Sequence, residues 1–198
     1  MSTGRLEAFS DGVLAIIITI MVLALKVPDG HDLAALRDTT GTALLSYILS
    51  FTYVGIYWNN HHHLFQATDR ITGGVLWANL HLLFWLSLLP FTTEWMAESG
   101  FERTPVMIYG VNLMLAAIAY AVLQSGITRG EGSDSRLQRA LGRDFKGTAS
   151  RVLYILGLAA AALNPDGSRV GVGLAIGCFV LVAAMWLVPD RRLERVFD

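Results

Sequence analysis

Polar side chains that could do chemistry border long apolar stretches in three separate parts of the sequence. They are Arg5, Ser10 and Asp11 in the first part, residues 58–63 (Trp-Asn-Asn-His-His-His) in the second, and Asn79 and His81 in the third. An ionisable group at the centre of a membrane span costs roughly 2.5–3.5 kcal/mol on insertion scales, so such groups usually mark an ion pathway, a proton relay or a packing contact. We therefore treat these residues as the candidate functional set.

The three consecutive histidines raise the question of a metal site. Neighbouring residues of a helix point about 100° apart, so His61, His62 and His63 cannot all face one ion. No His-x-x-x-His or Glu-x-x-His pair accompanies them. We predict no metal site, and we expect His61 to face a polar network while His62 and His63 lie at the membrane surface.

Catalytic chemistry is not indicated either. No nucleophile, base and orienting group stand at a recognisable spacing, and no nucleotide-binding motif occurs. The net charge of −1 gives no reason to expect a nucleic-acid partner, and the only cysteine, Cys178, excludes an intrachain disulfide. We predict that the chain is not an enzyme, has no enzyme substrate and needs no cofactor.

The elements that position the polar residues are membrane-spanning helices. The 198-residue chain is 54% apolar and 16% charged, with a mean hydropathy of +0.49, whereas a soluble domain carries about 25% charged residues. A span needs roughly 20 mostly apolar residues. We predict a single all-α domain over residues 1–198 with six transmembrane helices, at residues 5–27, 41–63, 72–92, 105–125, 148–163 and 168–188.

Charges and turn residues predict how these helices are connected. With six spans, eleven of the fifteen lysines and arginines fall on the side of the two termini, so the positive-inside rule places both termini in the cytoplasm. Residues 164–167 (Asn-Pro-Asp-Gly) predict a tight turn before the last helix. In the loop 127–147, the spacing of Leu137, Leu141 and Phe145 is compatible with a short surface helix or with a solvated connector.

This topology brings the polar residues to one depth in the membrane. Arg5 and Asp11 begin the first helix, Trp58 and His61 end the second, and Asn79 lies in the inner half of the third. We therefore predict one hydrogen-bonded network in the cytoplasmic half. Arg5 and Asp11 are six residues apart and point about 120° away from each other, so each needs a partner on another helix or on a neighbouring subunit.

The first helix also carries an apolar stripe. Gly12, Ile16, Thr19 or Ile20, and Leu23 follow one another at steps of three and four residues. If several copies surround an axis, the stripe forms rings of branched aliphatic side chains, and such rings can gate a pore by dewetting. Any buried helix also has an apolar stripe, so on spacing alone a packing role stays open.

The residues at the start of the first helix resemble a known motif. Arg5-Leu-Glu-Ala-Phe9-Ser10-Asp11-Gly12 looks like the R-x-x-x-F-S-D motif of the transmembrane protein 175 family, the lysosomal-type potassium channels. Further matches are Trp58-x-x-His61-x-x-Leu64-Phe65, Asn79-Leu80 and Leu89-Pro90-Phe91, so the resemblance covers residues 5–92.

The resemblance implies a potassium-permeable channel without a carbonyl-type selectivity filter, and the sequence contains no Thr-Val-Gly-Tyr-Gly run. A single six-helix repeat implies a homotetramer in a prokaryotic plasma membrane, with the first helix lining the pore. The implied constriction residues are Ile16, Thr19, Ile20 and Leu23, with Gly12 at the pore mouth.

The resemblance also gives the polar residues a role. It implies that the motif residues hold the first helix against the second and third helices and against the next subunit. These residues are Arg5, Phe9, Ser10 and Asp11, matched by Trp58, His61 and Asn79.

Two other functions remain open at this stage. A proton-coupled secondary transporter could use Asp11 and His61 as titrating groups. A scaffolding membrane protein could use Arg5 and Asp11 only as packing contacts.

Overall fold

The computed structural model describes residues 3–66, 68, 71–131, 145–164 and 169–187, and within these ranges the chain forms helices and no strand. The helices are α1 (Thr3–Leu23), α2 (Leu33–Gln66), α3 (Gly73–Ser87), α4 (Leu89–Glu98), α5 (Arg103–Glu131), α7 (Phe145–Leu163) and α8 (Arg169–Leu187). The predicted fold class is therefore confirmed as all-α. The expected turn at 164–167 and the positions of Leu137 and Leu141 lie outside the described residues, apart from Asn164, while Phe145 begins α7.

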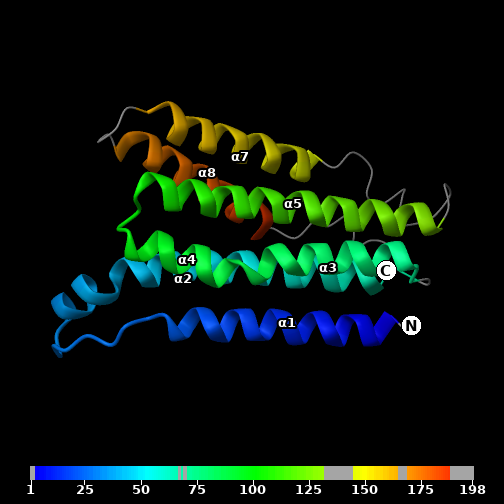
Figure 1. Cartoon of the computed structure of the whole chain (residues 1–198), viewed down its shortest axis with the longest axis horizontal. Helices are drawn as coiled ribbons and strands as arrows, with labels where there is room; N and C mark the ends of the chain where they lie inside the picture. Colours follow the sequence, from blue (N-terminus) through cyan, green and yellow to red (C-terminus); the bar gives the residue numbers. More distant parts are fainter. Residues whose placement is uncertain (1–2, 67, 69–70, 132–144, 165–168, 188–198) are drawn as a thin grey trace.

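The helices run side by side along the long axis of the molecule (Figure 1). α1 lies at one edge of the bundle and packs against α2, α3 and α4. At the opposite edge, α7 and α8 pack against each other and against α5. α1 and α7 both begin at the same end of the bundle, which the positive-inside rule predicts to be the cytoplasmic end.

The first helix is shorter than predicted and the second is longer. α1 ends at Leu23 rather than at residue 27. Pro28 disfavours helical geometry in the residue before it, and in a helix its ring would clash with the carbonyl of Ala24, so the helix cannot continue to residue 27. Its last turn closes instead with hydrogen bonds from the N–H groups of Ala24 and Leu25 to the carbonyls of Met21 and Val22. α2 begins at Leu33 rather than at residue 41. The Oδ1 of Asp32 accepts a hydrogen bond from the N–H of Ala35 at 2.8 Å, and this N-terminal cap starts the helix early.

The predicted third helix, 72–92, is in fact two helices in sequence, α3 and α4, and the second of them continues to Glu98. Pro90 lies in the first turn of α4, where its missing N–H is not needed by that helix. The helix therefore restarts at the proline rather than ending there. The other bounds differ less: α5 extends the predicted 105–125 to 103–131, α7 begins at 145 rather than 148, and α8 covers 169–187 rather than 168–188.

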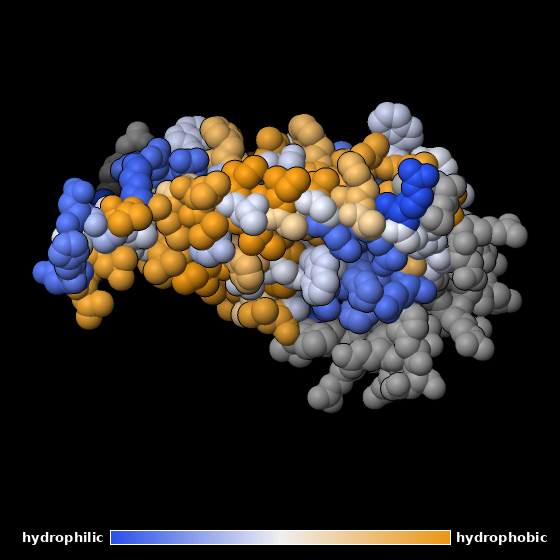
Figure 2. Space-filling model, turned by 90° about the horizontal axis from the view of Figure 1, so that it is seen from below, coloured by the Kyte–Doolittle hydropathy of each residue, from blue (hydrophilic) through white to orange (hydrophobic). Residues whose placement is uncertain are grey.

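Four helical segments of the described chain are long and apolar enough to cross a membrane: Thr3–Leu23, Gly73–Glu98, Arg103–Arg129 and Arg169–Leu187. The other two predicted spans, 41–63 and 148–163, fall within α2 and α7. An apolar band crosses the face of the molecule on which α1 lies, and polar residues are gathered toward its ends (Figure 2).

Small residues allow α7 and α8 to approach closely. A Cβ built on Gly157 would lie 3.3 Å from the Cα of Ala175 and 3.2 Å from the Cβ of Cys178. In lipid, such small faces let helices gain van der Waals contact that larger residues would prevent. Cys178 itself is a free, half-buried thiol in this contact.

Candidate functional site

α1 has one buried face and one exposed face. The buried side chains follow each other at steps of three and four residues: Leu6, Ser10, Leu14, Ile17 and Met21. On the other side of the helix lie the stripe residues Gly12, Ile16, Thr19, Ile20 and Leu23, which are all exposed in the single chain. Ile16 is 59% exposed and Leu23 is 82% exposed. The face that α1 turns outward is the one shown in Figure 2.

Three of the predicted network residues meet inside the chain. Ser10 on α1, His61 on α2 and Asn79 on α3 are each at most 2% exposed. The Nδ2 of Asn79 donates a hydrogen bond to the Oγ of Ser10 at 3.0 Å, and the Oδ1 of Asn79 lies 2.8 Å from the Nε2 of His61. One amide therefore joins three helices.

The hydrogen bonds also fix the direction of this chain of contacts. The hydroxyl of Ser10 donates its only proton to the carbonyl of Leu6 at 2.9 Å, so its oxygen is left to accept from Asn79. This turns the Oδ1 of Asn79 toward His61. Because an amide oxygen can only accept, the Nε2 of His61 carries the proton in this arrangement. A neutral His61 satisfies the contact without placing a charge in the buried layer.

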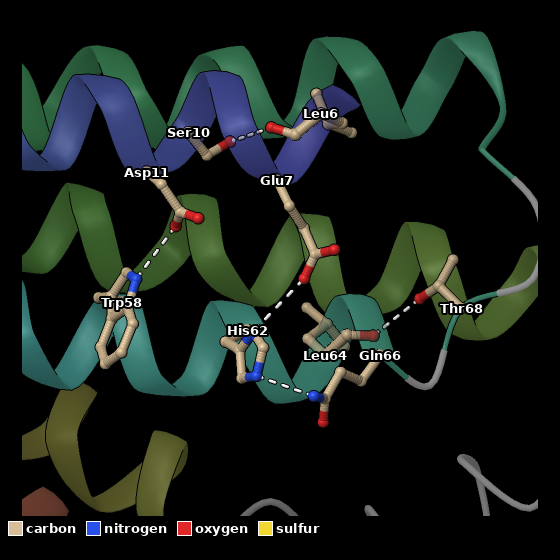
Figure 3. Close-up of polar contacts among 9 residues, drawn as sticks. All are labelled: Leu6, Glu7, Ser10, Asp11, Trp58, His62, Leu64, Gln66 and Thr68. Atoms are coloured by element: carbon tan, nitrogen blue, oxygen red, sulfur yellow. Dashed lines mark hydrogen bonds and ion pairs between the residues drawn. The ribbon is translucent and has the colours of Figure 1, made fainter. Parts of the chain in front are cut away.

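Asp11 and Trp58 form a second link between α1 and α2. The Nε1 of Trp58 donates a hydrogen bond to the Oδ1 of Asp11 at 3.0 Å (Figure 3). Both residues are exposed in the single chain. Asp11 and His61 thus have different partners, and the motif carboxylate faces outward rather than into the buried network.

A third link was not predicted from the sequence. The Nδ1 of His62 lies 3.5 Å from the Oε1 of Glu7, and its Nε2 lies 2.8 Å from the Nε2 of Gln66 (Figure 3). The sequence signal was a pair of matching spacings: Glu7 and Asp11 are four residues apart on α1, and Trp58 and His62 are four apart on α2. Two side chains at this spacing share one helix face.

Two motif residues stay outside these contacts in the single chain. Arg5 is exposed and has no hydrogen bond or ion pair among the described residues, and Phe9 is 51% exposed. Gly12 also lies in open space, since a Cβ built on it would have no neighbour within 4 Å. All three lie on the side of α1 that the other described helices leave uncovered.

The opposite end of α1 is also held in place. The Nζ of Lys26 lies 2.9 Å from the Oε1 of Glu98 at the end of α4, and the hydroxyl of Thr40 donates to the carbonyl of Lys26 at 2.7 Å. The hydrogen bond to Glu98 and the negative charge of that carboxylate raise the pKa of Lys26 above its ordinary value. The segment after α1 is thereby tied to both α2 and α4.

Within the described ranges, no group of three or more His, Cys, Asp or Glu side chains is placed to hold a metal ion. His61 to His63 illustrate the reason. His61 turns inward to Asn79, while His62 turns to Glu7 on α1.

The chain is similar to several known proteins. Residues 5–90 match the family model described as the endosomal/lysosomal potassium channel TMEM175. A potassium channel of Chryseobacterium sp. (strain P1-3) is 53% identical over 195 residues, covering 98% of this chain and 97% of that protein. A potassium channel of Streptomyces collinus is 30% identical over 189 residues, covering 91% and 89%.

The fold is similar to that of a solved channel as well. The crystal structure of a lysosomal potassium-selective channel TMEM175 homologue from Chamaesiphon minutus superposes with a TM-score of 0.75 at 26% identity, covering 95% of this chain and 97% of that one. These relatives are named as channels, which confirms the prediction that the chain is not an enzyme. The chain is a multi-pass membrane protein and belongs to the TMEM175 family.

Proposed function

We propose that this chain is the subunit of a homotetrameric, potassium-permeable channel of a prokaryotic plasma membrane, with α1 lining the pore and the termini in the cytoplasm. The names of the relatives from Chryseobacterium and Streptomyces support potassium as the permeant ion. The proposal includes six transmembrane helices per subunit. The six predicted spans fall in α1, α2, α3 with α4, α5, α7 and α8.

The main support for the proposal is that α1 buries one face against its own chain and leaves the opposite face exposed. α1 is fixed to its own chain by Leu14, Ile17 and Met21, and the opposite stripe is exposed. α1 also lies at the edge of the bundle (Figure 1), where it is available to face the same helix of other copies. Such a stripe around a symmetry axis forms a continuous wall.

The stripe residues give the proposed pore its chemistry. A ring of Ile16 side chains narrows it with aliphatic groups, and a narrow apolar ring opposes the entry of water and hydrated ions. Ile20 and Leu23 continue the wall toward the other end of α1. The hydroxyl of Thr19 donates to the carbonyls of Ala15 and Ile16 at 3.1 and 2.9 Å, so its oxygen lone pairs are free to contact a cation.

Buried hydrogen bonds between α1, α2 and α3 hold the exposed stripe of α1 in its orientation. Ser10, Asn79 and His61 fix the rotation of α1 against α2 and α3, so that Ile16 faces away from its own chain. Arg5 lies on the same exposed side, with Gly12 at the pore mouth. Because unpaired arginines around the mouth would repel cations, we expect Arg5 to contact an acidic group of the neighbouring subunit.

The function is tested by reconstituting the protein in liposomes under an outward potassium gradient and following a voltage-sensitive dye. We expect a potassium-dependent potential that does not saturate like a carrier and does not need a pH gradient. Flux that saturates and requires a proton gradient would instead support the transporter that uses Asp11 and His61. Absence of flux from correctly folded protein would leave only the scaffolding role.

A further inference from the structure

A cleft lies between α2, α4 and the last turn of α1, at the end of the bundle where α1 finishes (Figure 1). Its volume is about 380 Å³, which falls within the roughly 300–1,000 Å³ of pockets that hold small organic ligands. On α2 the lining runs from Thr39 to Tyr47 and on α4 from Pro90 to Glu98, so each wall is eight residues or roughly 12 Å long. The cleft is therefore large enough for a small molecule.

The cleft lies behind α1 when seen from the proposed pore. Its lining on α1 includes Met21, which belongs to the buried face of that helix. The exposed stripe residues Ile16, Ile20 and Leu23 are not among the described residues that line it. A molecule in the cleft would thus touch the rear of α1 without entering the proposed pore.

The charged residues of the cleft leave one carboxylate for a ligand. Lys26, Glu94 and Glu98 line it, which gives the lining a net charge of −1. The Nζ of Lys26 lies 2.9 Å from the Oε1 of Glu98, so these two charges largely compensate each other. Glu94, one turn before Glu98 on α4, forms no hydrogen bond or ion pair with another residue of the described ranges. Its charge raises the pKa of Lys26 only slightly and after that of Glu98.

Hydroxyl groups line the wall that α2 contributes. Thr39, Thr42 and Tyr47 are lining residues, and within the part of the chain that the structure describes their hydroxyls have no hydrogen-bond partner. A hydroxyl oxygen can accept hydrogen bonds from the N–H groups of a ligand. The α2 wall therefore suits a group with several N–H donors.

The remaining lining is largely apolar. Met21 and Leu25 contribute aliphatic side chains from the end of α1 and the segment after it, and Pro90 contributes its ring from the start of α4. Burying a hydrocarbon group against such side chains is favourable by about 25 cal/mol per Å² of apolar area. The cleft thus combines one available carboxylate, several hydroxyls and an apolar surface.

This combination selects among classes of ligand. An anion would be repelled by Glu94, and an uncharged apolar molecule would gain nothing from it. A divalent metal ion takes several oxygen ligands and would be repelled by the ammonium of Lys26. A monovalent organic cation satisfies the single available carboxylate and also uses the apolar surface.

We propose that the cleft binds a protonated primary amine with a short hydrocarbon chain. The ammonium group lies beside Glu94 and the hydroxyls of α2, and the chain lies against Met21 and Leu25. The site gives the protein a ligand contact that joins α1 to α2 and α4 at a distance from the proposed pore.

The test follows the melting temperature of the purified protein in detergent micelles as hexylammonium chloride is added at constant total chloride. A ligand that binds the folded state raises the melting temperature with a concentration dependence that gives its Kd. 1-Hexanol is the comparison, because it has the same chain and also enters micelles but carries no charge. We expect hexylammonium to raise the melting temperature and 1-hexanol not to raise it.

Matched variants separate the carboxylate from the cleft. Glu94→Gln should weaken the affinity for hexylammonium by about tenfold, the factor typical of one hydrogen bond to a charged group. Glu102→Gln removes an exposed carboxylate just before α5 that does not line this cleft, so it should leave the affinity unchanged. Ala43→Phe fills the cleft and should abolish the rise, whereas Ala34→Phe, at an exposed position of the same helix, should not.

Three results would overturn the proposal. The first is an equal effect of hexylammonium and 1-hexanol on the wild-type protein, which would indicate a general effect on the micelle. The second is an unchanged affinity in Glu94→Gln, and the third is an unchanged rise in Ala43→Phe. Because the measurement needs no ion flux, its outcome is independent of the proposed channel function.

Discussion

The side-chain amide of Asn79 donates a hydrogen bond to the hydroxyl oxygen of Ser10 at 3.0 Å, at a point where both residues are fully buried. This contact joins the third helix of the chain to the first. The contact fixes the rotation of α1 about its own axis. It therefore determines which side of α1 faces the chain and which side is left for other copies. The position of Ile16 therefore depends on a residue that does not touch it.

Replacing Asn79 should loosen the first helix. In Asn79→Ala, the hydroxyl oxygen of Ser10 and the Nε2 of His61 both lose a buried partner. A buried polar group without a partner costs about 1–3 kcal/mol, so we expect a clear drop in melting temperature in detergent micelles. Asn59→Ala is the control, because Asn59 is exposed. Equal melting temperatures for the two variants would contradict the role given to Asn79.

The motif carboxylate should act as a hydrogen-bond acceptor rather than as a titrating group. In Asp11→Asn, an amide oxygen can still accept from the Nε1 of Trp58, so the variant should retain most of its potassium flux in liposomes. Asp11→Ala removes the acceptor and should lower thermal stability. The transporter alternative makes the opposite prediction for Asp11→Asn, since a neutral amide cannot carry a proton.

The ion pair of Lys26 and Glu98 should depend on pH. Glu98 raises the pKa of Lys26 above its ordinary value of 10.5, so the stabilisation is fully present below 10.5 and is lost as pH rises through the higher folded-state value. The difference in melting temperature between wild type and Lys26→Gln should be small, since the pair is exposed, and it should vanish at strongly alkaline pH.

A suitable control for that pH dependence is Arg37→Gln. Arg37 forms an exposed ion pair with Asp38 at 2.9 Å, but a guanidinium stays protonated throughout this range. The effect of Arg37→Gln should therefore not change as the pH rises. If Lys26→Gln and Arg37→Gln show the same pH profile, the assignment of the effect to Lys26 is wrong.

Glycines on α7 and α8 should differ in their tolerance of a side chain. Gly157→Ala places a methyl group within 3.3 Å of the backbone of Ala175, so we expect lower thermal stability. Gly173 has no neighbour within 4 Å of a built Cβ. There, replacement by alanine should be neutral or stabilising by up to about 1 kcal/mol, because alanine favours the helix. Equal melting temperatures would contradict the close packing of α7 on α8.

The sequence was informative where polar residues interrupt apolar runs. Ser10, His61 and Asn79 stand out because each lies in or beside a long apolar stretch, and the predicted six-span topology brings them to a common depth. The spacing of Ile16 and Leu23 marked an apolar stripe on α1, but α1 has a second apolar stripe in Leu14, Ile17 and Met21, and only the fold shows which of the two is buried.

Other features depended on information that periodicity does not contain. The early start of α2 required recognition of Asp32 as a helix cap, and the continuation beyond Pro90 required recognition that a proline can open a new helix. The contact of Glu7 with His62 depends on the register between α1 and α2.

If Ile16 lines a pore, silver ions should reach a cysteine placed at this position. Ag⁺ is a small monovalent cation that reacts with thiolates, so it can follow the path of K⁺ to an introduced cysteine. The background is Cys178→Ala, which removes the only native cysteine. Ile16→Cys is compared with Val22→Cys, which is 42% exposed but about 120° around the helix from Ile16.

The measurement is single-channel current in a planar bilayer with chloride-free potassium solutions. We expect discrete unitary steps in all variants, and stepwise, irreversible loss of those steps when Ag⁺ is added to Ile16→Cys. Val22→Cys and the cysteine-free background should keep their current. Unitary steps that persist in Ile16→Cys, or that are lost equally in Val22→Cys, would contradict a pore lined by this face of α1.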